Sequence, residues 1–159
     1  MAYLLLKLLH IASVVVFLGN ILTGLFWAAH ANRSRDFPLI ASTFQGIIRS
    51  DRIFTTPAVV GILVSGVAAA VIAHMPLLRT GWILWPIVLF SISGAAFGMR
   101  VAPLQRRLAA LAGEQEDDNE SWEQYEQLYR KWELWGLVAI VTPAAALVIM
   151  VLKPSIPAL

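Results

Sequence analysis

Residues 3–31 read YLLLKLLHIASVVVFLGNILTGLFWAAHA, and Lys7 is the one formally charged residue among them. A helix needs about 20 predominantly apolar residues to cross a hydrocarbon layer that is roughly 30 Å thick. This stretch is longer than that, so it can tilt or extend beyond the membrane. It predicts a membrane-spanning helix. Ala29-His30-Ala31 resembles the cleavage site of a signal peptide, but the apolar run is too long for one and no basic segment precedes it.

Three further apolar stretches, residues 56–78, 81–99 and 134–152, have the length of a membrane span. They lack the alternating pattern of barrel strands, and only helices or closed barrels satisfy the backbone in hydrocarbon. We therefore expect an all-α fold, a four-helix transmembrane bundle. Residues 1–159 form a single transmembrane domain, with cytoplasmic connections at 32–55 and 100–133.

Composition supports this class and excludes others. Hydrophobic residues make up 58% of the chain and charged residues 14%, so a disordered chain is excluded. The absence of cysteine excludes disulfides, thiolate metal sites and thiol catalysis. We find no phosphate-binding glycine loop, nucleophile elbow or metalloprotease helix, so an enzyme is the less expected outcome.

Basic residues indicate the orientation. The two longer connections hold nine of them, whereas the opposite side has only Lys7, Arg79 and Lys153. The positive-inside rule places both connections in the cytoplasm and both termini outside, in a multi-pass membrane protein. Topology and anionic lipid explain the basic face, so we expect the bilayer as partner and no nucleic acid.

Both connections are predicted to contain short amphipathic helices in the headgroup region. Four apolar residues recur at helical spacing after Asp36, a cap, and Pro38, namely Phe37, Ile40, Phe44 and Ile47. A second helix is expected from Ser121, which could form a capping box with Gln124. It carries an aromatic face that is typical of an interfacial anchor, with a cofactor or partner surface as the alternative: Trp122, Tyr125, Tyr129 and Trp132.

Caps and small residues give further expectations for the spans. The second span should begin at Thr55-Thr56-Pro57. Close helix contacts are expected at Gly61-Ser65-Ala69 and at Gly94-x-x-x-Gly98. No acidic residue falls within the predicted spans, and we expect Asp36, Asp51 and the acidic run 114–123 to be solvated in the connections.

One face of the first helix is polar. Its residues recur every three or four positions, and they are Lys7, His10, Ser13, Phe17, Asn20 and Gly24. Polar groups are costly in hydrocarbon, so this stripe should face the bundle interior, while Lys7 is close enough to the end to snorkel. His10 has two interpretations: an axial ligand of haem b, or a histidine hydrogen-bonded to a neighbouring helix. His74 would be a second axial ligand only if tilt closes an offset of roughly 10 Å from His10.

Three motifs carry a family resemblance: Leu6-Lys7-Leu8-Leu9-His10, Phe54-Thr55-Thr56-Pro57-Ala58 and Ala102-Pro103-Leu104-Gln105. With them the chain resembles a family of uncharacterised bacterial integral membrane proteins that carries a domain-of-unknown-function label. This resemblance implies a four-helix inner-membrane protein and no established activity.

The chain is distantly similar to the membrane-bound haem-containing protoporphyrinogen oxidases. Lys7 and His10 match the opening of their first helix, Gly19 and His30 match its later positions, and Thr56-Pro57 matches the start of their second. That resemblance implies that His10 serves haem. The lysine and histidine that those enzymes have in the third helix are missing from residues 81–99.

Two functions follow as hypotheses. The first is a haem-b-binding protein in a redox or haem-related role, with His10 on the iron, Lys7 near a propionate and Asn20 as a supporting donor. The second is a non-catalytic membrane subunit or scaffold that packs with other membrane protein subunits or as a homo-oligomer.

Overall fold

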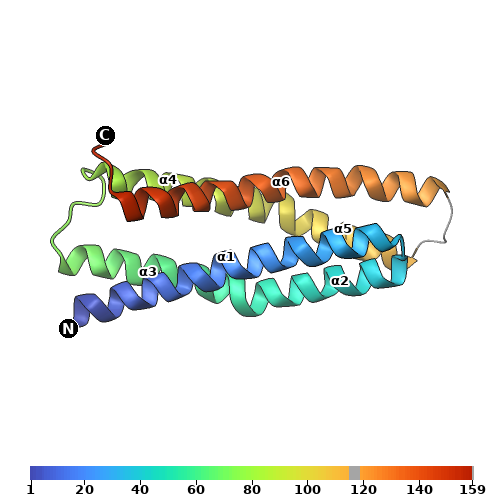
Figure 1. Ribbon diagram of the computed structural model, residues 1–159, viewed down its shortest axis with the longest axis horizontal. Helices are drawn as coiled ribbons and strands as arrows, with labels where there is room; N and C mark the ends of the chain where they lie inside the picture. The colour runs from blue at the N-terminus through green and yellow to red at the C-terminus, as the bar shows by residue number, and fades with distance from the viewer. Residues whose placement is uncertain (115–118, 159) are drawn as a thin grey trace.

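A computed structural model describes residues 1–114 and 119–158, and within them the chain is helical. Four helical rods lie side by side, and both termini lie at the same end (Figure 1). The first rod is α1 (Ala2–Ser34) and the last is α6 (Asn119–Leu152). The second joins α2 (Phe37–Ser50), η1 (Asp51–Thr55) and α3 (Thr56–Ile72), and the third joins α4 (Gly81–Ala96), η2 (Phe97–Val101) and α5 (Ala102–Glu114). All four rods are long and apolar enough to cross a membrane.

The two middle rods each contain a π-helical turn just before a proline. Pro57 has no backbone N–H to donate to the carbonyl of Ile53, and its ring would conflict with that carbonyl in a regular helix. In the wider turn η1, the N–H of Thr56 instead donates to the carbonyl of Asp51, five residues back. The turn η2 precedes Pro103 in the same way. Both helices therefore continue past their prolines, as a π-bulge allows.

These turns correct the boundaries expected from sequence. Thr55-Thr56-Pro57 does not begin a helix, because it lies inside the rod that runs from Phe37 to Ile72. The same rod ends at Ile72, within the apolar stretch 56–78. The third rod extends beyond the apolar stretch 81–99 to Glu114, and much of the expected connections is helical. Asp36 does cap α2, since its side chain accepts a hydrogen bond from the backbone N–H of Leu39.

The start of the fourth rod also differs from the expectation. Helix α6 already includes Asn119 and Glu120, so Ser121 lies inside it. The acidic run 114–123 was expected to be a solvated loop. Its central part, residues 115–118, falls outside the described residues, and 119–123 belong to α6.

The bundle has two unlike halves. The connection half contains the end of α1, α2, α5 and the beginning of α6, and it holds the main core. The terminal half contains the beginning of α1, α3, α4 and the end of α6, where α1 packs on α3 and α4 packs on α6. The terminal half has a small core and many exposed large apolar side chains, among them Val60, Leu63, Val67, Leu137, Val141 and Val148. Such a surface suits lipid rather than water.

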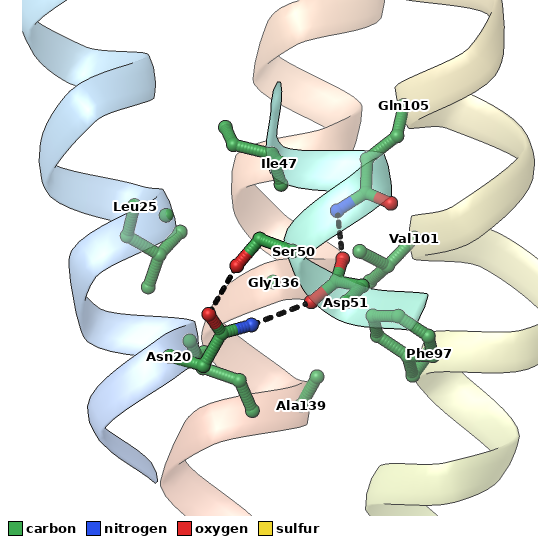
Figure 2. A pocket seen from close by; sticks show the side chains of 12 residues that line it. Asn20, Leu25, Ile47, Ser50, Asp51, Phe97, Val101, Gln105, Gly136 and Ala139 are labelled. Carbon is green, nitrogen blue, oxygen red and sulfur yellow. Dashed lines mark hydrogen bonds between the residues drawn. The ribbon is translucent and has the colours of Figure 1, made fainter. Parts of the chain in front are cut away.

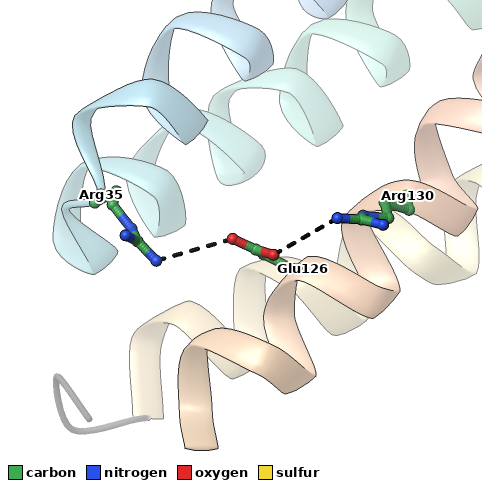
Figure 3. A network of polar contacts seen from close by, with 3 residues as sticks. All are labelled: Arg35, Glu126 and Arg130. Carbon is green, nitrogen blue, oxygen red and sulfur yellow. Dashed lines mark ion pairs between the residues drawn. The ribbon is translucent and has the colours of Figure 1, made fainter. Parts of the chain in front are cut away.

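The amphipathic faces pack inside the protein. Phe37 stacks on Trp122 with ring centroids 4.0 Å apart, and Phe44 meets Trp132 edge-on. Tyr125 and Phe44 are fully buried. The expectation that the aromatic face of residues 122–132 anchors at the membrane surface is therefore wrong, because the face fills the core of the connection half. The outer surface there carries the exposed ion pairs of Glu126 with two arginines, Arg35 and Arg130 (Figure 3).

The expected small-residue contacts hold for one span and not for the other. A Cβ added at Gly61 would collide with the Ser13 side chain of α1, and Ser65 is fully buried, so α1 and α3 do approach closely there. Gly94 and Gly98 are exposed, and a Cβ at either would meet no atom within 4 Å. They do not mediate helix packing within the described chain.

Candidate functional site

Asp51 is buried at the centre of the molecule, where the two halves of the bundle meet. Only 9% of its surface is exposed. The wide turn η1 places Asp51 and Thr55 on the inner side, while Arg52, Ile53 and Phe54 between them face outward. The expectation of a solvated Asp51 is therefore wrong, because its helix continues where a connection had been expected.

Three neutral donors surround the carboxylate, and two of them, Asn20 and Gln105, are seen in Figure 2. Asn20 Nδ2 of α1 lies 3.1 Å from Asp51 Oδ1, and the Thr55 hydroxyl donates to the same oxygen over 2.9 Å. Gln105 Nε2 of α5 donates to Asp51 Oδ2 over 3.1 Å. Asn20 Nδ2 also donates to Thr55 Oγ1 over 2.9 Å, and the Ser50 hydroxyl donates to Asn20 Oδ1. We call these five residues the polar centre: Asn20, Ser50, Asp51, Thr55 and Gln105.

The carboxylate has no cationic partner in the described part of the chain. The ion pairs found there involve Glu126 and not Asp51. Arg52 is next in sequence to Asp51 but its side chain is exposed. A buried carboxylate is costly when ionised unless charges or donors compensate it, so Asp51 depends on neutral hydrogen bonds alone. Such a group can change its protonation state without breaking an ion pair.

Two small cavities adjoin the polar centre. The first, of about 30 Å³, is lined by Asn20, Ser50, Asp51 and Gln105 together with apolar side chains. The second, of about 50 Å³, lies toward the terminal half and is lined mainly by apolar residues, with Thr55 and Ser93 as its hydroxyl groups. Each exceeds the 10–15 Å³ that a water molecule needs.

His10 lies apart from the polar centre. Asn20 follows it by ten residues, which is roughly 15 Å along a helix axis. The His10 Nδ1 atom is 2.9 Å from the carbonyl oxygen of Ile62, so the imidazole is hydrogen-bonded to the neighbouring helix α3. A Cβ added at Gly66 would lie 2.9 Å from His10 Cε1, so this glycine makes room for the ring. The hydrogen bond to a neighbouring helix, one of the two interpretations of His10, is therefore present.

The other residues predicted for a haem site are exposed or belong to the polar centre. Lys7 is exposed near the start of α1, and His74 is exposed in the turn after α3, with a positive φ of 53°. His30 is exposed at the far end of α1. Asn20, predicted as a supporting donor near His10, belongs instead to the polar centre. In the described residues there is also no cluster of three or more His, Cys, Asp or Glu side chains that could hold a metal ion.

Sequence reasoning placed Asn20 on the inner face of its helix but missed the residues that it binds. Asp51, four residues before Thr55 and two before the apolar pair Ile53-Phe54, was the available signal. This signal predicts a buried Asp51 only when the helix is known to continue through Pro57.

One comparison with known proteins gives a match. The family described as "Predicted integral membrane protein (DUF2269)" matches residues 4–154. No curated protein and no solved structure matches the chain.

Proposed function

Because the chain belongs to this family of predicted integral membrane proteins, we propose that its polar centre works in a membrane as a proton-transfer site, with Asp51 as the group that binds and releases the proton. The observation that carries the proposal is the buried carboxylate with three neutral donors and no cation. An ionisable side chain within a membrane bundle is costly, and proton pathways are among its main uses.

The depth of Asp51 supports this role. Helix α3 runs for 17 residues from the polar centre toward the terminal end, which is about 25 Å of apolar helix. Arg52 beside Asp51 is exposed, and the exposed side chains that follow, Ile53 and Phe54, are apolar. The polar centre therefore belongs near the inner boundary of the hydrocarbon layer, where a proton can arrive from the cytoplasmic connections.

The orientation of the amides favours a proton over a metal cation. Asn20 and Gln105 both direct NH₂ groups toward the carboxylate. Hard cations such as Ca²⁺ and Mg²⁺ need six or more oxygen ligands. The polar centre directs hydrogen atoms at the carboxylate oxygens, an arrangement that stabilises the charged form until a proton arrives.

Proton flux into liposomes tests this proposal. Purified protein would be reconstituted with a pH-sensitive dye inside, and flux would be driven by an imposed potassium diffusion potential. We expect flux from the unchanged protein and from Asp36→Asn, because Asp36 caps an exposed helix end. We expect its loss in Asp51→Asn, a substitution close in size. Equal flux from both variants, or none from folded unchanged protein, would contradict the proposal.

A second candidate, haem b binding at His10, is favoured by one observation. When Nδ1–H donates to the Ile62 carbonyl, the Nε2 lone pair is left for a metal, and metal-binding histidines are commonly oriented in this way. His10 would hold the iron and Lys7 could meet a propionate.

Absorption spectra of purified protein, oxidised and dithionite-reduced, test this second candidate after expression with haem supplied. A Soret band that is lost in His10→Ala and kept in His30→Ala would support it, because His30 is exposed at the other end of α1. A visible spectrum without that band in well-folded protein would rule it out.

A further inference from the structure

The two cavities beside the polar centre share part of their lining. Ile21, Phe97 and Ala139 line both cavities, so the cavities adjoin one another. Asp51 lines only the first cavity and Thr55 only the second. Thr55 is 3% exposed, and its hydroxyl donates a hydrogen bond to Asp51 Oδ1, which links the linings of the two cavities.

We propose that the Thr55 hydroxyl relays protons between the second cavity and Asp51. This inference rests on the proposed proton-transfer function and names the route by which protons reach the carboxylate from the terminal side. Thr55 is thus the residue that joins the apolar half of the bundle to the polar centre.

The hydrogen bonds around Thr55 are arranged for such a transfer. A hydroxyl has one proton and two lone pairs. The Thr55 proton is donated to Asp51 Oδ1, and one lone pair accepts from Asn20 Nδ2. The second lone pair is free to accept from a water molecule in the cavity that Thr55 lines. Asn20 therefore acts as a positioning residue, because its hydrogen bond determines which lone pair of Thr55 is left for the water molecule.

The second cavity has room for that water. Its volume is about 50 Å³, and Thr55 and Ser93 are the residues with hydroxyl groups in a wall that is otherwise apolar. The Ser93 hydroxyl donates to the carbonyl oxygen of Ala139, which leaves the Ser93 oxygen as an acceptor.

The proposed proton transfer breaks and forms the same number of O–H bonds. A hydronium ion in the cavity loses one O–H bond as its proton binds Thr55 Oγ1. The original Thr55 O–H bond breaks, and its proton forms the O–H bond of the Asp51 carboxylic acid. Water, a neutral threonine and a neutral aspartic acid remain, and the reverse sequence releases the proton.

Substitutions at Thr55 distinguish the proton relay through Thr55 from the binding of the proton by Asp51. Flux into liposomes would be measured for Thr55→Val, which keeps the shape without the hydroxyl, and for Thr55→Ser, which keeps the hydroxyl. We expect Thr55→Val to lower the flux by about tenfold or more, and Thr55→Ser to keep it. Equilibrium titration of Asp51 by infrared spectroscopy should still show a protonated acid in both variants.

Filling the second cavity provides an independent test that leaves the polar centre untouched. Val59 is half-buried and lines this cavity, whereas Val60 is exposed and does not line it. We expect Val59→Phe to lower the flux and Val60→Phe to leave it unchanged. A Thr55→Val or Val59→Phe protein with the flux of the unchanged protein would overturn the relay. Failure of Asp51 itself to titrate would overturn the proton-transfer function and the relay together.

Discussion

At the scale of single residues, Asn20 connects the first helix to the polar centre. Its amide nitrogen donates to both Asp51 Oδ1 and Thr55 Oγ1, and its oxygen accepts from Ser50. Every hydrogen-bonding atom of this side chain thus contacts the second rod. In an apolar surrounding the loss of a donor to a carboxylate is costly, because the acceptor is left without a replacement.

We predict that Asn20→Leu destabilises the protein by about 2 kcal/mol, because the buried Asp51 carboxylate loses one of its three donors. The midpoint of thermal unfolding in detergent should fall by roughly 4–8 °C for a chain of this size. Ser42→Ala is the control, because the exposed Ser42 hydroxyl bonds only to a carbonyl of its own helix. Equal midpoints for the two variants would show that Asn20 does not support Asp51.

At the scale of helices, the contact between α1 and α3 depends on residues without large side chains. Ser13 packs against Gly61, and the His10 ring packs against Gly66. A ring at this distance cannot coexist with a Cβ, so a larger residue at position 66 must displace the imidazole from the Ile62 carbonyl.

We predict opposite effects for two glycine substitutions within helices. Gly66→Ala should destabilise the protein by about 1–3 kcal/mol, because the added methyl group displaces His10. Gly98→Ala should be neutral or stabilise by about 0.5 kcal/mol, because open space surrounds the position and alanine favours helix. Thermal unfolding of both variants in the same detergent checks this. A Gly66→Ala protein as stable as Gly98→Ala would contradict the packing described for His10.

The sequence was most informative about which segments are apolar and least informative about where helices join. Apolar runs predicted four long helices, and Asp36 was recognised as a cap. Pro57 was read as a helix start because proline is favoured in a first turn. A π-helical turn lets the same residue lie inside a helix, and no residue pattern distinguishes the two cases. Asp51 was misplaced for this reason, and the polar centre was missed with it.

At the scale of the whole molecule, the terminal half and the connection half of the bundle differ in their charged residues and in the position of the chain ends. Both termini lie at the end of the apolar terminal half (Figure 1). The two arginines and the one glutamate of the Arg35–Glu126–Arg130 contacts lie in the connection half. The aromatic face of α6 could be recognised from the spacing of its residues. That this face packs on α2 could not be predicted, because contacts between helices far apart in the sequence depend on how the whole bundle packs.

We predict that both termini are outside and that the connection half faces the cytoplasm, as the distribution of basic residues indicates. The chain has no cysteine, so single introduced cysteines report topology directly. Ser155 and Ser34 are exposed at opposite ends. A membrane-impermeant thiol reagent added to intact cells should label Ser155→Cys at once, and Ser34→Cys only after permeabilisation. The reverse pattern would contradict the orientation, and labelling of both in intact cells would contradict the spans.

Infrared difference spectroscopy of the reconstituted protein during a pH titration tests the central claim most directly. The account predicts a carboxylic acid carbonyl band that appears reversibly as the pH falls, persists in Asp36→Asn and is missing in Asp51→Asn. A folded protein without a band that depends on Asp51 at any pH would contradict it, and Asp51 would then be a structural link between helices rather than a proton site.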